Sequence, residues 1–148
     1  MQMKILVLNG PNLNLLGIRE PTIYGRETYE TLCRKIRNRA EELGVEVDIF
    51  QSNSEGDLVT RIQQALGRSD AIIINPAAYT HTSIAILDAL KAVGLPAAEV
   101  HISNPLEREP FRHISYAGMA CEKHYFGVGL DGYLRALEDL YEEWKNRR

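Results

Sequence analysis

Strand-like and helix-like segments alternate along this 148-residue chain, and this alternation constrains its fold more than any other feature. Continuous or alternating apolar runs, typical of strands, occupy residues 4–8, 45–49, 71–74, 97–102 and 124–128. Apolar residues at three- and four-residue spacing predict helices at residues 28–43, 54–66 and 83–93, and from residue 131 onward. We interpret the pattern as five successive β-α units, in which right-handed crossovers bury both faces of a parallel sheet.

Five strands in this length predict a flavodoxin-like three-layer sandwich, an α/β fold whose five-stranded parallel sheet has the order 2-1-3-4-5. The length suits a single catalytic domain covering residues 1–148. With 17 basic against 20 acidic residues the net charge is −3, and a nucleic-acid binder would instead show a basic stripe. No apolar run approaches the roughly 20 residues that cross a bilayer. Together with the absence of a signal-peptide pattern, this leads us to expect a cytoplasmic protein with no membrane partner.

Two long loops and three polar clusters indicate where the functional site lies. The loops, at residues 9–26 and 103–117, both leave the carboxyl ends of predicted strands, where open α/β sheets bind their ligands. Residues 9–12, 75–76 and 101–104 bring asparagines, a serine and a histidine to that same edge. These groups suit a hydroxyl-rich ligand or a small acid, although asparagine and serine also simply cap turns.

The predicted fourth strand carries Glu99 and His101, two residues apart and therefore on one face of the sheet. A carboxylate beside an imidazole fixes the ring tautomer and produces a general acid near neutral pH, although the pair could also be a purely structural ion pair. In the first loop, Tyr24 could act as a base only if a cation such as Arg19 or Arg112 lowered its pKa. From the residues alone, we interpret Tyr24 as a packing residue.

Several chemistries find no support in the pattern. No lysine lies at the predicted ligand edge, so a Schiff base is not expected, and the histidines lack the spacing of metal ligands. The main alternative is a flavodoxin-like module that binds FMN or a nucleotide, against which the missing hydroxyl-rich phosphate loop after the first strand argues. Residues 127–132 also match the dinucleotide-binding pattern G-x-G-x-x-G. Only 16 residues follow this motif, and Asp131 places negative charge where a pyrophosphate would bind. We therefore interpret these glycines as turn and packing residues.

Five blocks of the sequence resemble one known family along the whole chain, the type II 3-dehydroquinate dehydratases. The blocks are residues 9–21 followed by 24–25, then 51–56, 75–81, 99–104 and 108–112. The resemblance implies a hydro-lyase that removes water from 3-dehydroquinate by anti elimination through an enolate, giving 3-dehydroshikimate. It implies neither a metal nor an organic cofactor. It also implies a place in the shikimate pathway of aromatic amino acid biosynthesis, although quinate breakdown uses the same reaction.

The resemblance also implies catalytic roles, position by position. Tyr24 matches the base that removes the C2 proton, and Arg19 matches the residue that lowers the pKa of this base and stabilises the transition state. Asn12 matches the holder of a water molecule that steadies the enolate. His101, oriented by Glu99, matches the acid that protonates the departing hydroxyl.

Further positions match residues that bind the substrate or a neighbouring subunit. The substrate-binding matches are Asn75, His81, Ile102, Ser103 and Arg112, with the Ile102-Ser103 turn assigned to the carboxylate. Asp88 matches a residue that reaches the site of an adjacent subunit, and Ala85 and Ala92 share its helix face. The resemblance thus implies a homo-oligomer, a dodecamer built from trimers.

The sequence departs from the family pattern around the predicted fifth strand. Residues 119–126 replace a more apolar stretch that contains glycine, and Gly118 stands where a small hydroxyl residue is common. No catalytic position is changed. We expect the departure to affect the packing of the edge strand and an assembly contact.

Overall fold

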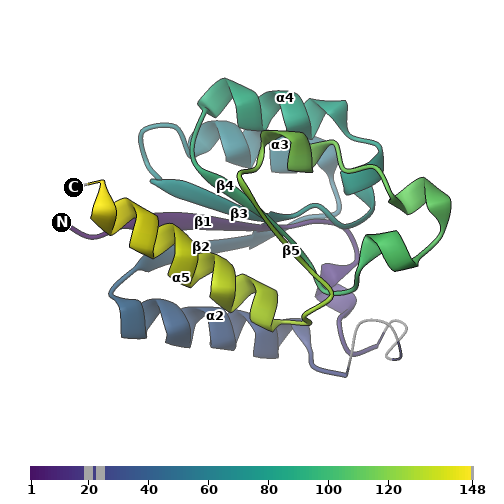
Figure 1. Cartoon of the computed structure of the whole chain (residues 1–148), viewed down its shortest axis with the longest axis horizontal. Coiled ribbons are helices and arrows are strands. Elements are labelled where there is room, and N and C mark those ends of the chain that lie inside the picture. Colours follow the sequence, from purple (N-terminus) through teal and green to yellow (C-terminus); the bar gives the residue numbers. More distant parts are fainter. Residues whose placement is uncertain (19–21, 23–25, 148) are drawn as a thin grey trace.

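The computed structural model describes residues 1–18, 22 and 26–147, in which five strands form one parallel sheet (Figure 1). The strands are β1 (Lys4–Asn9), β2 (Glu46–Gln51), β3 (Ala71–Asn75), β4 (Ala97–His101) and β5 (Lys123–Phe126). Their order is β2-β1-β3-β4-β5, which confirms the predicted topology. Because the chain leaves β1 toward one edge and β3 toward the other, these two strands flank the topological switch point.

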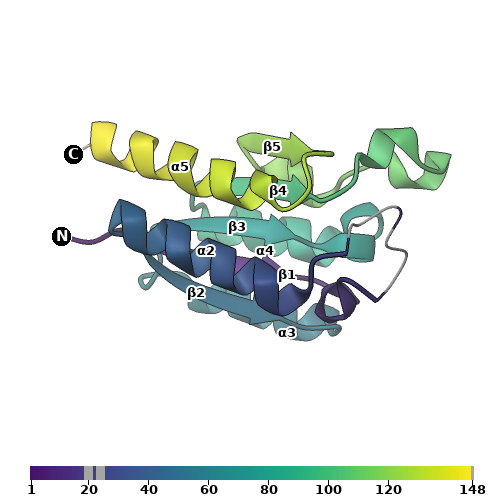
Figure 2. The same cartoon turned by 90° about the horizontal axis from the view of Figure 1, so that it is seen from below.

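Four α-helices among the described residues cover the two faces of the sheet, giving three layers (Figures 1 and 2). The helices are α2 (Tyr29–Leu43), α3 (Glu55–Gln64), α4 (Ile84–Val93) and α5 (Asp131–Asn146). One face packs against α2 and α5, and the other against α3 and α4. None of the helices in the described part of the chain combines the length and apolar character that a membrane crossing needs.

The central strands are buried on both sides, as their continuous apolar runs predict. Side chains of β1 and β3 alternate between the two cores: Ile5, Val7 and Ile73 face α2 and α5, whereas Leu6, Leu8, Ile72 and Ile74 face α3 and α4. Burial on both faces is typical of parallel sheets and requires this density of isoleucine, leucine and valine.

Side-chain caps fix where three helices begin, and therefore where each loop ends. Thr28, Ser54 and Ser83 each accept a hydrogen bond from the backbone N–H three residues further on. As predicted, α2 ends before Gly44 and α4 before Gly94.

The connection from β4 to β5 corrects the prediction of five β-α units. It contains three short 3-10 helices, η3 (Pro105–Glu107), η4 (Pro110–Arg112) and η5 (Ala117–Ala120), and no α-helix. Prolines begin η3 and η4, and proline supports a helix start but not its continuation. The part with η3 and η4 projects beyond the carboxyl ends of the strands in Figure 1, whereas η5 returns to contact α4. β5 is also shorter than the predicted 124–128, because the chain turns at residues 127–130 to enter α5.

Candidate active site

A small cleft opens at the carboxyl end of the sheet, where β1, β3 and β4 stop. Its volume is about 90 Å³. The lining residues come from these strand ends and from both long loops: Pro11, Asn12, Leu13, Leu15, Leu16, Asn75, Ala77, Ala78, His81, His101, Ile102, Ser103, Pro105, Arg108 and Arg112. The structure therefore places seven of the predicted site residues around one cavity: Asn12, Asn75, His81, His101, Ile102, Ser103 and Arg112.

The floor of the cleft rests on a buried network of amides and a phenol. Asn9 and Asn75 are register partners at the ends of β1 and β3. The hydroxyl of Tyr133, from α5, donates to Asn9 Oδ1 at 2.7 Å and accepts from Asn75 Nδ2 at 3.0 Å. Asn75 Oδ1 accepts from Ala77 N at 3.1 Å, and its amide retains a second N–H for a ligand. Burial raises the pKa of Tyr133, so its hydroxyl remains a donor.

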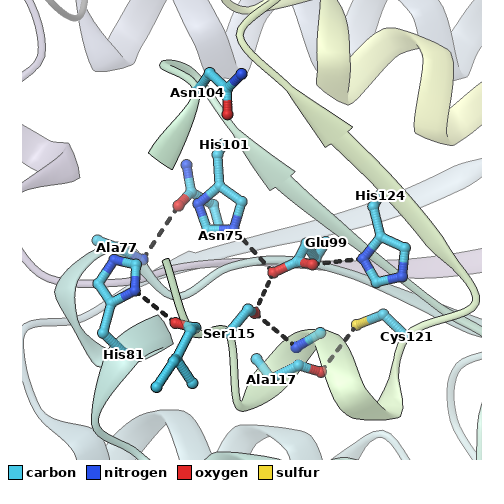
Figure 3. A network of polar contacts seen from close by, with 12 residues as sticks. Asn75, Ala77, His81, Glu99, His101, Asn104, Ser115, Ala117, Cys121 and His124 are labelled. Atoms are coloured by element: carbon cyan, nitrogen blue, oxygen red, sulfur yellow. Dashed lines mark hydrogen bonds and ion pairs between the residues drawn. The ribbon is translucent and has the colours of Figure 1, made fainter. Parts of the chain in front are cut away.

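Glu99 and His101 form a buried hydrogen-bonded pair beside the cleft (Figure 3). Glu99 is 1% exposed, and its Oε2 lies 2.9 Å from His101 Nε2. Burial alone would raise the pKa of Glu99, but hydrogen bonds from His101 and Ser115 outweigh burial and hold the pKa below its ordinary value. An ionised carboxylate only accepts, so His101 donates through Nε2. Among the described residues, His101 Nδ1 has no hydrogen-bond partner and is available to a ligand.

The opposite wall carries His81 and two arginines. His81 Nδ1 lies 2.7 Å from the carbonyl oxygen of Ile114. Burial lowers the pKa of His81, and the charges of His101 and Arg112 lower it further. A neutral ring that donates through Nδ1 presents Nε2 as an acceptor. Arg108 and Arg112 flank Glu109, with Nε–Oε distances of 3.8 and 3.2 Å, and bring positive charge to the rim.

Four of the predicted residues lie at the mouth of the cleft, away from it, or outside the described part of the chain. Asn12 adopts a left-handed backbone (φ 70°), and its N–H donates to Asn53 Oδ1, which holds it at the mouth of the cleft. Asp88 is exposed on α4 and does not line the cleft. Arg19 and Tyr24, the predicted charge donor and base, lie outside the described residues.

Three residues that hydrogen-bond to groups of the site were not among the predicted site residues. Tyr133 bonds to Asn9 and Asn75, and Ser115 and His124 bond to Glu99. Each reaches the site from a distant part of the sequence, and none belongs to a motif that carries chemistry by itself. The one available signal was the departure of residues 119–126 from the family pattern, which includes His124.

The G-x-G-x-x-G segment belongs to the packing of α5, as expected. A Cβ atom added at Gly132 would lie 3.0 Å from Val100 Cγ1, so the glycine allows α5 to approach β4 closely. The buried side chain of Val100 fills the space beside Gly132, where a larger residue would not fit.

The fold and the cleft define an α/β protein with an enzyme-type site for a small polar molecule. The family described as "Dehydroquinase class II" matches residues 3–141. A 3-dehydroquinate dehydratase of Lachnoclostridium phytofermentans is 53% identical over 139 residues, covering 93% of this chain and 96% of that protein. One from Caldicellulosiruptor bescii is 54% identical over 140 residues, covering 94% and 97%.

Solved structures show the same relationship. The crystal structure of the type II dehydroquinase from Butyrivibrio crossotus has a TM-score of 0.92 and 51% identity, covering 94% of this chain and 97% of that one. The type II dehydroquinase from Propionibacterium acnes has a TM-score of 0.90 and 44% identity, covering 96% and 99%. The chain therefore belongs to the class II dehydroquinases, as its sequence motifs predicted.

Proposed function

We propose that this protein is a 3-dehydroquinate dehydratase, a hydro-lyase that converts 3-dehydroquinate into 3-dehydroshikimate and water. The observation that carries the proposal is the buried Glu99–His101 pair beside the cleft, with His101 Nδ1 available to a ligand. Family membership supports the choice of substrate. The reaction needs a base at one carbon and an acid at the adjacent hydroxyl.

His101 supplies the acid. Its Nε2–H donates to the Glu99 carboxylate, which stabilises the imidazolium form and fixes the ring. The proton is delivered from the other ring nitrogen to the departing hydroxyl, which leaves as water. Glu99 remains ionised throughout and acts by orientation and charge.

Tyr24 and Arg19 supply the base half of the mechanism, on the strength of their family positions. The Tyr24 phenolate removes the C2 proton, and the electron pair of that C–H bond moves into the enolate. The Arg19 cation lowers the pKa of Tyr24 and stabilises the enolate together with a water held by Asn12. Collapse of the enolate then forms the C=C bond as the C–O bond breaks.

The substrate carboxylate is bound at the turn formed by Ile102 and Ser103. Asn75, His81 and Arg112 bind the ring oxygens. In support of these roles, all five side chains line the cleft, with a donor amide at Asn75, an acceptor nitrogen at His81 and a cation at Arg112.

Turnover of 3-dehydroquinate tests the proposal, since the conjugated product absorbs in the ultraviolet. We expect turnover by the purified protein and its loss in Tyr24→Phe, which should still bind the substrate. Tyr141→Phe, which alters a tyrosine on α5 that stacks on Trp144, is the matched control and should retain the rate. Borohydride added with the substrate should leave activity intact, because no lysine adduct forms. Absence of turnover from pH 6 to 9, or a bound flavin instead, would contradict the proposal.

We further propose that the protein assembles as a dodecamer of trimers in which Asp88 reaches the cleft of a neighbouring subunit. In support, Ala85, Asp88 and Ala92 are all exposed on one face of α4, and Ile84 beside them is 55% exposed. Small side chains allow two such helix faces to approach closely.

A further inference from the structure

Glu99 is held by a second histidine besides the one that faces the cleft. His124 Nδ1 lies 2.5 Å from Glu99 Oε1, while His101 Nε2 and Ser115 Oγ occupy Oε2 at 2.9 and 2.5 Å (Figure 3). His124 lies opposite Glu99 in the register between β5 and β4. Glu99 is 1% exposed and the His124 side chain 40%, so His124 links a buried carboxylate to solvent.

The surroundings of the carboxylate leave it little freedom. The N–H of Gly118 donates to Ser115 Oγ at 2.9 Å, which aims that hydroxyl at Glu99. A Cβ atom at residue 118 would lie 2.4 Å from Glu99 Oε1, so glycine there leaves the space that this oxygen occupies. The Phe126 ring packs against both imidazoles, with centroids 5.3 Å from His101 and 6.1 Å from His124.

We propose that His124 is a positioning residue for the dehydration, acting through Glu99 on the proton that His101 delivers. The inference rests on the proposed function, because it assigns His101 the role of acid. His124 fixes the plane of the carboxylate and shares its negative charge. A carboxylate that serves two imidazoles stabilises the His101 imidazolium less strongly, so the proton on Nδ1 passes more readily to the leaving hydroxyl.

The other ionisable groups near Glu99 and His101 do not provide the hydrogen bond that His124 gives to the carboxylate. On the Glu99 side, burial raises the pKa of the Cys121 thiol to about 12, and the Glu99 charge adds to this, so the thiol stays neutral. On the His101 side, His81 and Arg112 act across the cleft and do not touch the carboxylate. Among the ionisable groups of the described residues on the side of Glu99 away from His101, His124 is therefore the one that donates to this carboxylate, next to the neutral hydroxyl of Ser115.

Two substitutions separate the hydrogen bond from a merely structural role. His124→Val removes the donor and keeps a β-branched residue suited to a strand. His124→Asn keeps an amide donor close to the position of Nδ1. Tyr125→Phe is the control on the same strand, because that hydroxyl bonds to Asp139 and not to Glu99.

Steady-state kinetics across pH provide the first readout. In His124→Val we expect kcat to fall about five- to tenfold with KM changed less than about twofold, since the lost hydrogen bond to a charged group acts on proton transfer. The alkaline limb of the kcat profile should move to higher pH by about half a unit or more, because Glu99 then stabilises the His101 imidazolium more strongly. His124→Asn should recover most of the rate, and Tyr125→Phe should match the parent protein.

The low-field proton NMR spectrum of the unliganded protein provides a readout that does not depend on turnover. We expect the His101 Nε2–H resonance to shift in His124→Val and to stay in place in Tyr125→Phe. An unchanged kcat profile and resonance in His124→Val would overturn the inference, as would equal losses in the Val and Asn variants without a shift of the alkaline limb. An inactive parent protein would instead contradict the proposed function.

Discussion

At the scale of single residues, one hydroxyl holds two strand ends together. Tyr133 bridges Asn9 and Asn75 from a completely buried position, and Asn75 in turn binds the N–H of Ala77. Ala77 has a left-handed backbone (φ 54°), which an alanine adopts at some cost. The cleft floor therefore depends on this phenol, although Tyr133 does not line the cleft.

Tyr133→Phe should destabilise the protein by about 1–3 kcal/mol, because it leaves Asn9 Oδ1 and Asn75 Nδ2 buried with one partner fewer. We also expect kcat/KM to fall by up to about tenfold, since Asn75 loses one of the bonds that orient its amide. Urea unfolding and steady-state kinetics measure the two effects. Tyr141→Phe on the same helix is the control, and equal stability of the two variants would refute this account of the network.

At the scale of elements, α4 begins at a cap that solvent does not reach. Ser83 is 1% exposed, and its hydroxyl accepts from Ile86 N at 2.9 Å. The capping serine of α3, Ser54, accepts in the same way at 3.2 Å but is exposed, so water can replace it there. Losing the buried cap should therefore cost more.

Ser83→Ala should lower the free energy of unfolding by about 1–2 kcal/mol, and Ser54→Ala by less. Ser83→Thr retains the hydroxyl and should recover part of the loss. Denaturation at one fixed protein concentration measures these differences, because assembly also contributes to stability. A larger effect from Ser54→Ala would show that burial does not set the strength of the cap.

At the scale of the whole molecule, the charge at the cleft differs from the charge of the chain. The net charge is −3, yet the described residues that line the cleft include Arg108 and Arg112 and no acidic side chain. Such a local excess of positive charge attracts an acidic substrate. The proposed assembly adds Asp88 from a second chain, so the working unit is larger than one domain.

Mixing two inactive variants tests whether Asp88 acts between subunits. Asp88→Asn and Tyr24→Phe should each be inactive or nearly so as homo-oligomers. After subunit exchange, sites that combine an intact Tyr24 with a neighbour's intact Asp88 should recover a substantial fraction of the activity. Native mass spectrometry verifies the exchange and the dodecamer; exchange without any recovery would place Asp88 outside the neighbouring site.

The sequence by itself determined the sheet order, the approximate helix ends and the edge of the sheet at which the candidate cleft lies. These features depend on local information: apolar periodicity sets strand or helix, and cap residues fix helix ends within a few positions. Glu99 and His101 could be paired for the same reason, because a two-residue spacing on one strand fixes a common face.

Only the tertiary structure decided which distant side chains hydrogen-bond to the site residues. Tyr133 is 124 residues from Asn9, and His124 is 25 from Glu99, and no local pattern specifies such contacts. The long loop between β4 and β5 could be predicted, but not that it folds back to supply Ser115 and Gly118 to the carboxylate. Such contacts depend on how whole elements pack, because side-chain partners across a sheet are selected by register and available space, and neither is encoded within a short window of sequence.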